Sequence, residues 1–166
     1  MIPGVFFSQL QYNYSISGSV GYSFGEFEKD SYQRGFEAPI LSLAAEMERN
    51  RNLFLLSYSY GQELEIIASS DFKIQELNLL YGRKINITKW MDFRPYVGIG
   101  YLNINDQTKG FEAAADINIR NLSFPIKLRF NFLPDNNINF GIDLSAMYSK
   151  NAENRSPNLF LRYNFQ

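Results

Sequence analysis

The chain has 166 residues, enough for one compact domain and too few for two of ordinary size. It contains no cysteine and no histidine, which excludes disulfides, thiolate metal sites and every catalytic arrangement that depends on a histidine. The formal net charge is -1 and both signs are mixed along the chain, so there is no basic surface for nucleic acid. We therefore expect no enzyme, no cofactor, no metal site and no nucleic-acid partner.

Residues 10–24 alternate between apolar and small polar side chains almost without a break. A period of two is the period of a β-strand. The apolar positions also follow an order along the segment, with Tyr12 and Tyr14 first, Ile16 and Val20 in the middle, and Tyr22 and Phe24 last. This order is typical of a strand that crosses a bilayer, because aliphatic side chains suit the hydrocarbon and aromatic rings suit the two interfaces.

Residues 1–9 precede this pattern, and we interpret them as an N-terminal tail or the remnant of a secretory signal. The barrel domain is expected to span residues 10–166. Similar alternation recurs in seven further segments, at residues 41–48, 54–61, 72–81, 90–101, 122–132, 138–148 and 159–165.

Several connections between these segments can be interpreted from the same pattern. Arg49–Asn52 is a polar link that predicts a hairpin, and Leu133–Asn137 and Gly82–Lys89 are predicted turns. Within residues 72–81 the apolar positions change parity, which we interpret as a β-bulge.

Residues 103–121 admit two interpretations, because Phe111, Ala113, Ala115, Ile117 and Ile119 also alternate. Single-chain outer-membrane barrels usually have an even strand number, periplasmic termini, short periplasmic turns and long outer loops. Treating 103–121 as an outer loop gives eight strands, with the other long loops at 25–38, 62–71 and 149–157. We therefore predict an all-β fold, an antiparallel up-and-down transmembrane β-barrel of eight strands with both termini periplasmic.

Three segments carry a resemblance to a known family: Arg94–Tyr101 (RPYVGIGY), Leu122–Arg129 (LSFPIKLR) and Leu159–Phe165 (LFLRYNF). With the pattern of the whole chain, they resemble the small eight-stranded outer-membrane β-barrels of Gram-negative bacteria. Members of that family usually end on the aromatic residue itself, whereas here Gln166 follows Phe165. The resemblance implies residence in the outer membrane and contact with membrane lipids and lipopolysaccharide, but it implies no activity.

The interior of an eight-stranded barrel is just filled by side chains, and charges are buried only when they are paired. Strand parity places seven charged residues on the inner face, and we predict that they form a salt-bridged lumen network: Glu46, Glu48, Arg94, Lys127, Arg129, Asp143 and Arg162. The alternative for Glu46 and Glu48 is a solute or proton path, or a carboxylate pair that performs acid and base chemistry.

Two further groups of residues have predicted roles. The expected interface aromatic belt consists of Tyr12, Tyr22, Phe24, Tyr60, Tyr81, Trp90, Tyr101, Tyr148, Tyr163 and Phe165. Exposed aromatic residues among loop charges can anchor a protein partner, and the candidates are Phe27, Tyr32, Phe36 and Phe111.

We therefore expect a non-enzymatic outer-membrane barrel, either a structural component or an accessory or binding subunit of a larger envelope assembly. The alternative is a soluble lipocalin-like barrel that carries an apolar ligand, in which the apolar face lines a cavity. Periodicity by itself does not separate the two.

Overall fold

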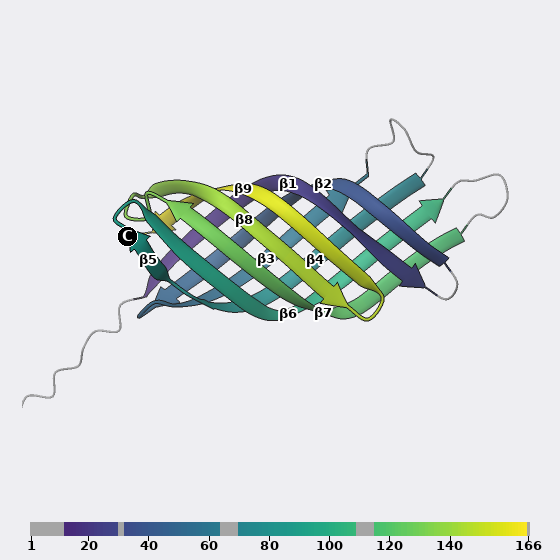
Figure 1. Cartoon of the computed structure of the whole chain (residues 1–166), viewed down its shortest axis with the longest axis horizontal. Helices are drawn as coiled ribbons and strands as arrows, with labels where there is room; N and C mark the ends of the chain where they lie inside the picture. The colour runs from purple at the N-terminus through teal and green to yellow at the C-terminus, as the bar shows by residue number, and fades with distance from the viewer. Residues whose placement is uncertain (1–11, 30–31, 64–69, 109–114, 166) are drawn as a thin grey trace, which may run out of the picture.

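A computed structural model describes residues 12–29, 32–63, 70–108 and 115–165 of the chain (Figure 1). The described residues form these strands: β1 (Asn13–Lys29), β2 (Tyr32–Arg49), β3 (Asn52–Gln62), β4 (Ser70–Arg83), β5 (Ile85–Thr88), β6 (Met91–Thr108), β7 (Ala115–Phe132), β8 (Ile138–Ser149) and β9 (Ala152–Phe165). No helix long and apolar enough to cross a membrane occurs in this part of the chain.

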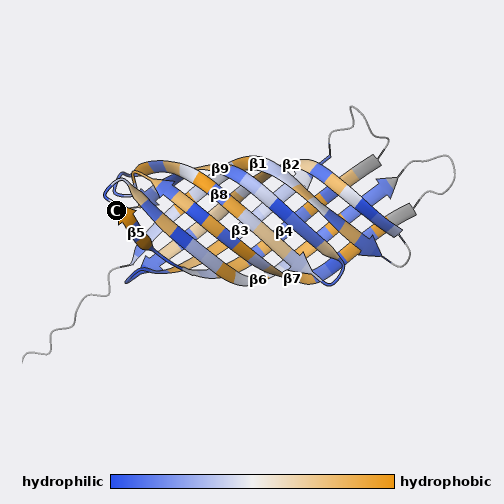
Figure 2. Cartoon of the chain, in the orientation of Figure 1, coloured by the Kyte–Doolittle hydropathy of each residue, from blue (hydrophilic) through white to orange (hydrophobic). Residues whose placement is uncertain are grey.

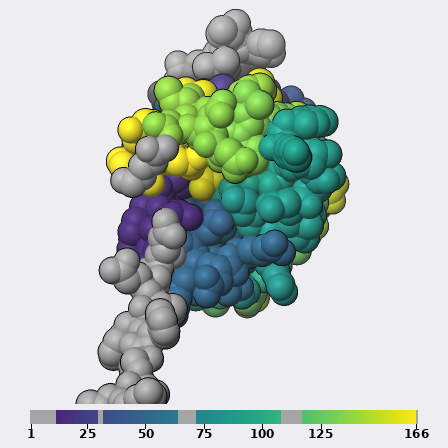
Figure 3. Space-filling model, turned by 90° about the vertical axis from the view of Figure 1, so that its left-hand side faces the viewer, coloured from purple at the N-terminus to yellow at the C-terminus, as the bar shows by residue number. Residues whose placement is uncertain are grey.

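Consecutive strands pair antiparallel from β1 to β4 and from β6 to β9. β4 and β5 both pair with β6, and β1 also pairs with β9, so the sheet closes on itself. The short β5 is not a separate wall element, because β4 and β5 keep one register against β6, from Gly82↔Tyr96 to Ile85↔Phe93. The end view in Figure 3 shows the ring, with purple β1 beside yellow β9. The predicted fold class, a closed antiparallel barrel of eight strands, is confirmed.

The two ends of the barrel differ. We call the end with the described chain termini and the three turns at 50–51, 89–90 and 133–137 the terminal end, and the opposite end the far end (Figure 1). The predicted hairpin at Arg49–Asn52 is confirmed: Asn50 and Arg51 have φ of 51° and 68°, as a two-residue turn with the twist of its strands requires.

Several predicted connections are wrong because the strands are longer than expected. Most of the loops placed at 25–38, 103–121 and 149–157 is strand, since β1 and β2, β6 and β7, and β8 and β9 continue toward the far end. Residues 115–119 belong to β7, so they are neither a loop nor a ninth strand. The predicted turn at Gly82–Lys89 is also mostly strand, and the chain turns at Lys89 and Trp90.

The bulge predicted within 72–81 is absent, since β4 keeps a constant register with β3 from Gln62↔Lys73 to Asn52↔Arg83. Phe72 and Ile74 point into the barrel and are fully buried, whereas Leu77 and Leu79 point outward. The side chains of β4 therefore alternate without a break. From the terminal end toward the far end, the apolar residues change from the outer face of the strand to its inner face.

This change of polarity runs around the whole barrel. A band of exposed apolar side chains surrounds its middle, including Leu43 at 69%, Leu159 at 63% and Val20 at 56% exposure. Figure 2 shows hydrophobic and hydrophilic residues alternating along these strands. Toward the far end, outward positions such as Glu26 and Glu37 are polar, and the interior is instead an apolar cluster of Phe27, Phe36, Ala38, Phe72, Ile74, Leu102, Ile104, Ile117, Ile119, Met147 and Ala152. The far end thus has the polar exterior and apolar interior of a water-soluble barrel, whereas the middle has the apolar exterior of a membrane barrel.

The lipocalin-like alternative is wrong for the middle of the barrel. A soluble carrier needs a polar outer surface and an apolar cavity. Here the outer surface carries the exposed aliphatic band, whereas Glu46, Arg94, Arg129 and Asp143 are buried inside. The chain is therefore a barrel of the membrane-spanning type.

We expect Ile16→Arg to lower the free energy of unfolding by about 2–4 kcal/mol, because Ile16 is exposed within the apolar band. Urea unfolding in lipid vesicles measures this. Gln33→Arg, an exposed polar position at the far end, is the matched control and should change stability by less than about 0.5 kcal/mol. Equal effects of the two substitutions would show that the apolar band does not lie in the bilayer.

Candidate functional site in the barrel lumen

A single carboxylate, that of Glu46 on β2, is the centre of the charged interior. Its Oε1 lies 2.5 Å from Nη1 of Arg94 and 2.8 Å from Nη2 of Arg162, and its Oε2 lies 3.8 Å from Nη1 of Arg129. The Tyr96 hydroxyl donates a hydrogen bond to Oε2. Alternation along β2, β6, β7 and β9 directs these side chains inward from four walls, which is why residues so far apart in sequence meet.

Two further carboxylates hold the arginines in place. Asp92 accepts hydrogen bonds from Arg94 Nε at 2.9 Å and Nη2 at 2.7 Å. Asp143 accepts from Arg129 Nε at 2.7 Å and Nη2 at 2.8 Å, a bidentate pair. Both pairs leave one side of the guanidinium directed toward Glu46, so the network is connected rather than a set of isolated ion pairs.

The edges of the network contain the remaining charges. Lys127 Nζ lies 3.6 Å from Asp143 Oδ2, and Lys84 Nζ lies 3.4 Å from Glu48 Oε1. The structure thus brings together all seven residues of the expected network. It adds Lys84, Asp92 and Tyr96; the inward parity of β6 could have identified the last two, whereas Lys84 was hidden in a segment interpreted as a turn.

A small polar chamber lies next to this network, toward the far end. It has a volume of about 20 Å³, room for one water molecule, and serine and asparagine side chains surround it together with Glu76 and Lys127. Glu76 accepts hydrogen bonds from Nδ2 of Asn154 at 2.6 Å and of Asn78 at 3.4 Å. Sequence reasoning missed Glu76 because it lies within the supposed bulge.

At the far end, an ion-pair cluster covers the apolar interior. Arg34 bonds to Asp106 and lies 2.6 Å from Glu63 Oε2, and its guanidinium carbon is 5.8 Å from the Phe72 ring centroid. Partial burial lowers the pKa of Arg34, but the hydrogen bond and the charge of Asp106 outweigh this, so its pKa is above the usual value. The cluster is a polar cap on an apolar plug.

The partner-loop prediction is wrong for Phe27 and Phe36, which are 1% and 3% exposed inside the barrel. Their parity on β1 and β2 points inward, so neither ring is available to a protein partner. Tyr32 is half-buried, with its ring centroid 6.1 Å from that of Phe27. Phe111 lies outside the described residues.

Eight of the ten residues of the expected aromatic belt lie on outward-facing strand positions, Trp90 lies in a terminal-end turn, and Tyr12 directly precedes β1. Nine are exposed, between 37% and 55%, and Tyr60 is half-buried, with its hydroxyl donating to Gln62 Oε1 at 2.9 Å. They form two groups: Tyr22, Phe24, Tyr60, Tyr101 and Tyr148 toward the far end, and Tyr12, Tyr81, Trp90, Tyr163 and Phe165 toward the terminal end. Their placement at the two lipid interfaces stays a prediction.

The geometry favours salt bridging over acid and base chemistry at Glu46 and Glu48. Both carboxylates are paired with arginine or lysine side chains, and the adjoining chamber has no room for a substrate. No group of three or more His, Cys, Asp or Glu suited to a metal ion occurs among the described residues.

Glu46→Gln should lower the free energy of unfolding by about 3–5 kcal/mol, because it leaves three buried guanidinium groups without their shared anion. Urea unfolding in lipid vesicles measures the loss. Glu153→Gln, which removes a carboxylate from the exposed pair with Arg155, is the control and should cost about 0–1 kcal/mol. Adding Arg162→Gln to Glu46→Gln should recover part of the loss, and strictly additive effects would show that the two groups do not interact.

No protein-family model and no curated protein sequence matches the chain. Solved structures do match it. Neisserial surface protein A (NspA) aligns with a TM-score of 0.74 at 10% identity over 92% of this chain and 97% of that one. A major outer membrane protein from Thermus thermophilus aligns with a TM-score of 0.64 at 12% identity, covering 93% and 99%.

Ail, the attachment invasion locus protein of Yersinia pestis, aligns with a TM-score of 0.60 at 18% identity over 91% of this chain and 98% of that one. These alignments span nearly the whole length of both chains in each comparison, so they concern the complete barrel and not one hairpin. The resemblance noted from the sequence is thereby confirmed, and the chain has the fold of the small eight-stranded outer-membrane β-barrels.

Proposed function

We propose that this protein is a non-enzymatic outer-membrane β-barrel of a Gram-negative bacterium, whose far end faces the outside and serves as a rigid binding surface. The reversal of polarity along the strands carries this proposal. Lipid-facing strands have no reason to continue for several residues with a polar outside and a packed apolar inside unless that extension stands in water.

The outer surface of the extension suits hydrogen-bonded recognition. On β4, β6 and β7 it presents side-chain amides, with Asn103 Nδ2 donating to Gln75 Oε1 at 3.1 Å and Asn118 donating to Asn105. On β1 and β9 it is acidic, where Glu26 and Glu153 are directly opposite. Such a surface fits a structural component or an accessory or binding subunit of an envelope assembly.

Two neighbours support a surface role. NspA is described as a surface protein, and Ail has been solved in complex with the heparin analogue sucrose octasulfate, in a structure with a TM-score of 0.58 at 18% identity. Since these neighbours are only 10% and 18% identical to this chain, its own far-end side chains, and not those of the neighbours, determine which partner it binds.

The orientation can be tested with single cysteines, because the chain has none of its own. Gln33→Cys at the far end should react with a membrane-impermeant maleimide on intact cells, whereas Asn136→Cys in the turn at 133–137 should react only after lysis. Both positions are exposed, so the reagent reaches them equally in lysed cells. The opposite labelling pattern, or recovery of the protein in the aqueous fraction without detergent, contradicts the proposal.

The same proposal includes a lumen that does not pass solutes. The Glu46 network, the far-end apolar cluster and the Arg34 cap lie in series along the axis, and the chamber between them holds about 20 Å³. Purified protein in a planar lipid bilayer should therefore show no stepwise conductance. Stable channels in the unmodified protein would overturn the closed lumen while leaving the membrane location untouched.

A further inference from the structure

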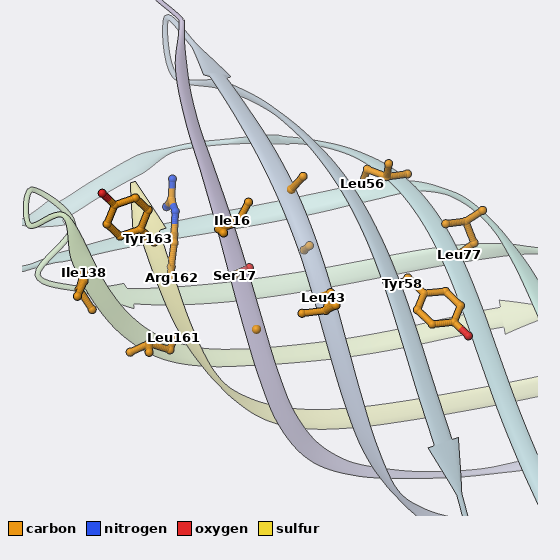
Figure 4. A pocket seen from close by; sticks show the side chains of 13 residues that line it. Ile16, Ser17, Leu43, Leu56, Tyr58, Leu77, Ile138, Leu161, Arg162 and Tyr163 are labelled. Atoms are coloured by element: carbon orange, nitrogen blue, oxygen red, sulfur yellow. The ribbon is translucent and has the colours of Figure 1, made fainter. Parts of the chain in front are cut away.

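Two apolar grooves on the lipid-facing surface of the described strands differ in charge. The larger, of about 590 Å³, runs over β8, β9 and β1 to β4. Its lining includes Ile16, Leu43, Leu161 and Tyr163, which Figure 4 labels, and the small residues Gly18 and Ala45. Its one charged residue, Arg162, belongs to the interior network and is 4% exposed. No charge on the outer surface borders this groove.

The smaller groove, of about 330 Å³, lies over β7, β8, β9 and β1 nearer the far end, and it has a cation at its rim. Its walls are Ile126, Leu128, Leu144 and Phe24, and its floor is formed by Ala146 and Pro157. Arg155 lines the same groove with 58% of its side chain exposed.

Strand register fixes the position of this arginine. Arg155 is directly opposite Ala146 on β8 and Phe24 on β1, so it stands in the row that contains a belt residue. Pro157 is two positions further along β9 toward the middle of the membrane, and the β1–β9 ladder is interrupted beside it, between Gly21↔Asn158 and Phe24↔Arg155. The small side chain of Ala146 and the interrupted ladder together leave room for an acyl chain on the side of Arg155 that faces the middle of the membrane.

The geometry points to a site for one phosphorylated lipid, in which an acyl chain lies in the groove over Ala146 and Pro157 and Arg155 binds the headgroup phosphate. The contact of Arg155 with Glu153, at 3.5 Å between exposed groups, is weak enough for a phosphate to replace it. A guanidinium forms bidentate, charge-assisted hydrogen bonds with phosphate, so charge and shape complement the same ligand.

The identity of the lipid rests on the proposed function, in which the far end faces the outside. If the far end faces outside, Arg155 is at the headgroup level of the outer leaflet, whose phosphorylated lipid is the lipid A part of lipopolysaccharide. We commit to lipid A as the occupant, since a glycerophospholipid of the inner leaflet would meet the terminal end instead.

Native mass spectrometry of the detergent-solubilised full chain tests the site, with bis-phosphorylated lipid A, dioleoylphosphatidylglycerol and dioleoylphosphatidylcholine as probes. The unmodified protein should retain one lipid A molecule more tightly than either other lipid. Arg155→Gln should weaken lipid A binding about tenfold by removing the charged donor, and Ala146→Phe should do the same by filling the groove.

Two matched controls separate this site from general attraction. Arg120→Gln removes an exposed arginine that lines neither groove, and Ala45→Phe fills the uncharged groove; both should leave lipid A binding within about twofold. Equal losses in Arg155→Gln and Arg120→Gln, or phosphatidylglycerol binding as tight as lipid A, would overturn the proposal. Since the assay uses purified protein, it fails or succeeds independently of the cysteine labelling that tests orientation.

Discussion

Side chains alternate strictly between the two faces of strands that are up to 18 residues long, and this alternation governs what the barrel places inside and outside. Once the sheet closes, each residue faces either the lumen or the surroundings, and no strand can change faces without a bulge. The strands pass from lipid to water by a change in which face carries the apolar residues, not by a change in the direction of the side chains. The same inner face bears Glu46 near the terminal end of β2 and Phe36 near its far end.

Burial of charge inside the barrel follows from the same constraint. With lipid outside, polar residues are directed inward, and an interior this narrow excludes the water that would solvate them. Glu46 resolves the conflict by sharing its carboxylate among Arg94, Arg129 and Arg162, while Asp92 and Asp143 fix two of the guanidinium groups. Such a network joins four walls of the barrel, because removal of Glu46 takes the shared carboxylate from three buried guanidinium groups.

The alternation of side chains also limits where a partner can bind. The described inner side chains form paired charges, a water-sized chamber and an apolar cluster, and the closed lumen that we propose assigns partner binding to the outside of the far end and to the lipid-facing grooves. Arg155 stands where these two regions meet, at the level of Phe24. A lipid bound at Arg155 would contact the barrel only over β1 and β7 to β9, where the smaller groove lies.

The all-β class, the eight walls, the hairpin at Arg49–Asn52 and the inward direction of the seven charged residues follow from the order of residues alone, since a period of two is visible in neighbouring residues. That order did not determine how far the strands extend, because a reversal of the apolar face looks locally like a loop or a bulge, as at Phe72 and Ile117. The closed barrel was needed to place Phe27 and Phe36 in the core and to bring Lys84 to the Glu46 network, whereas the parity of β6 gives the inward direction of Asp92 and Tyr96 but not their partners. Contacts between distant walls depend on barrel closure and strand stagger, which no local pattern encodes.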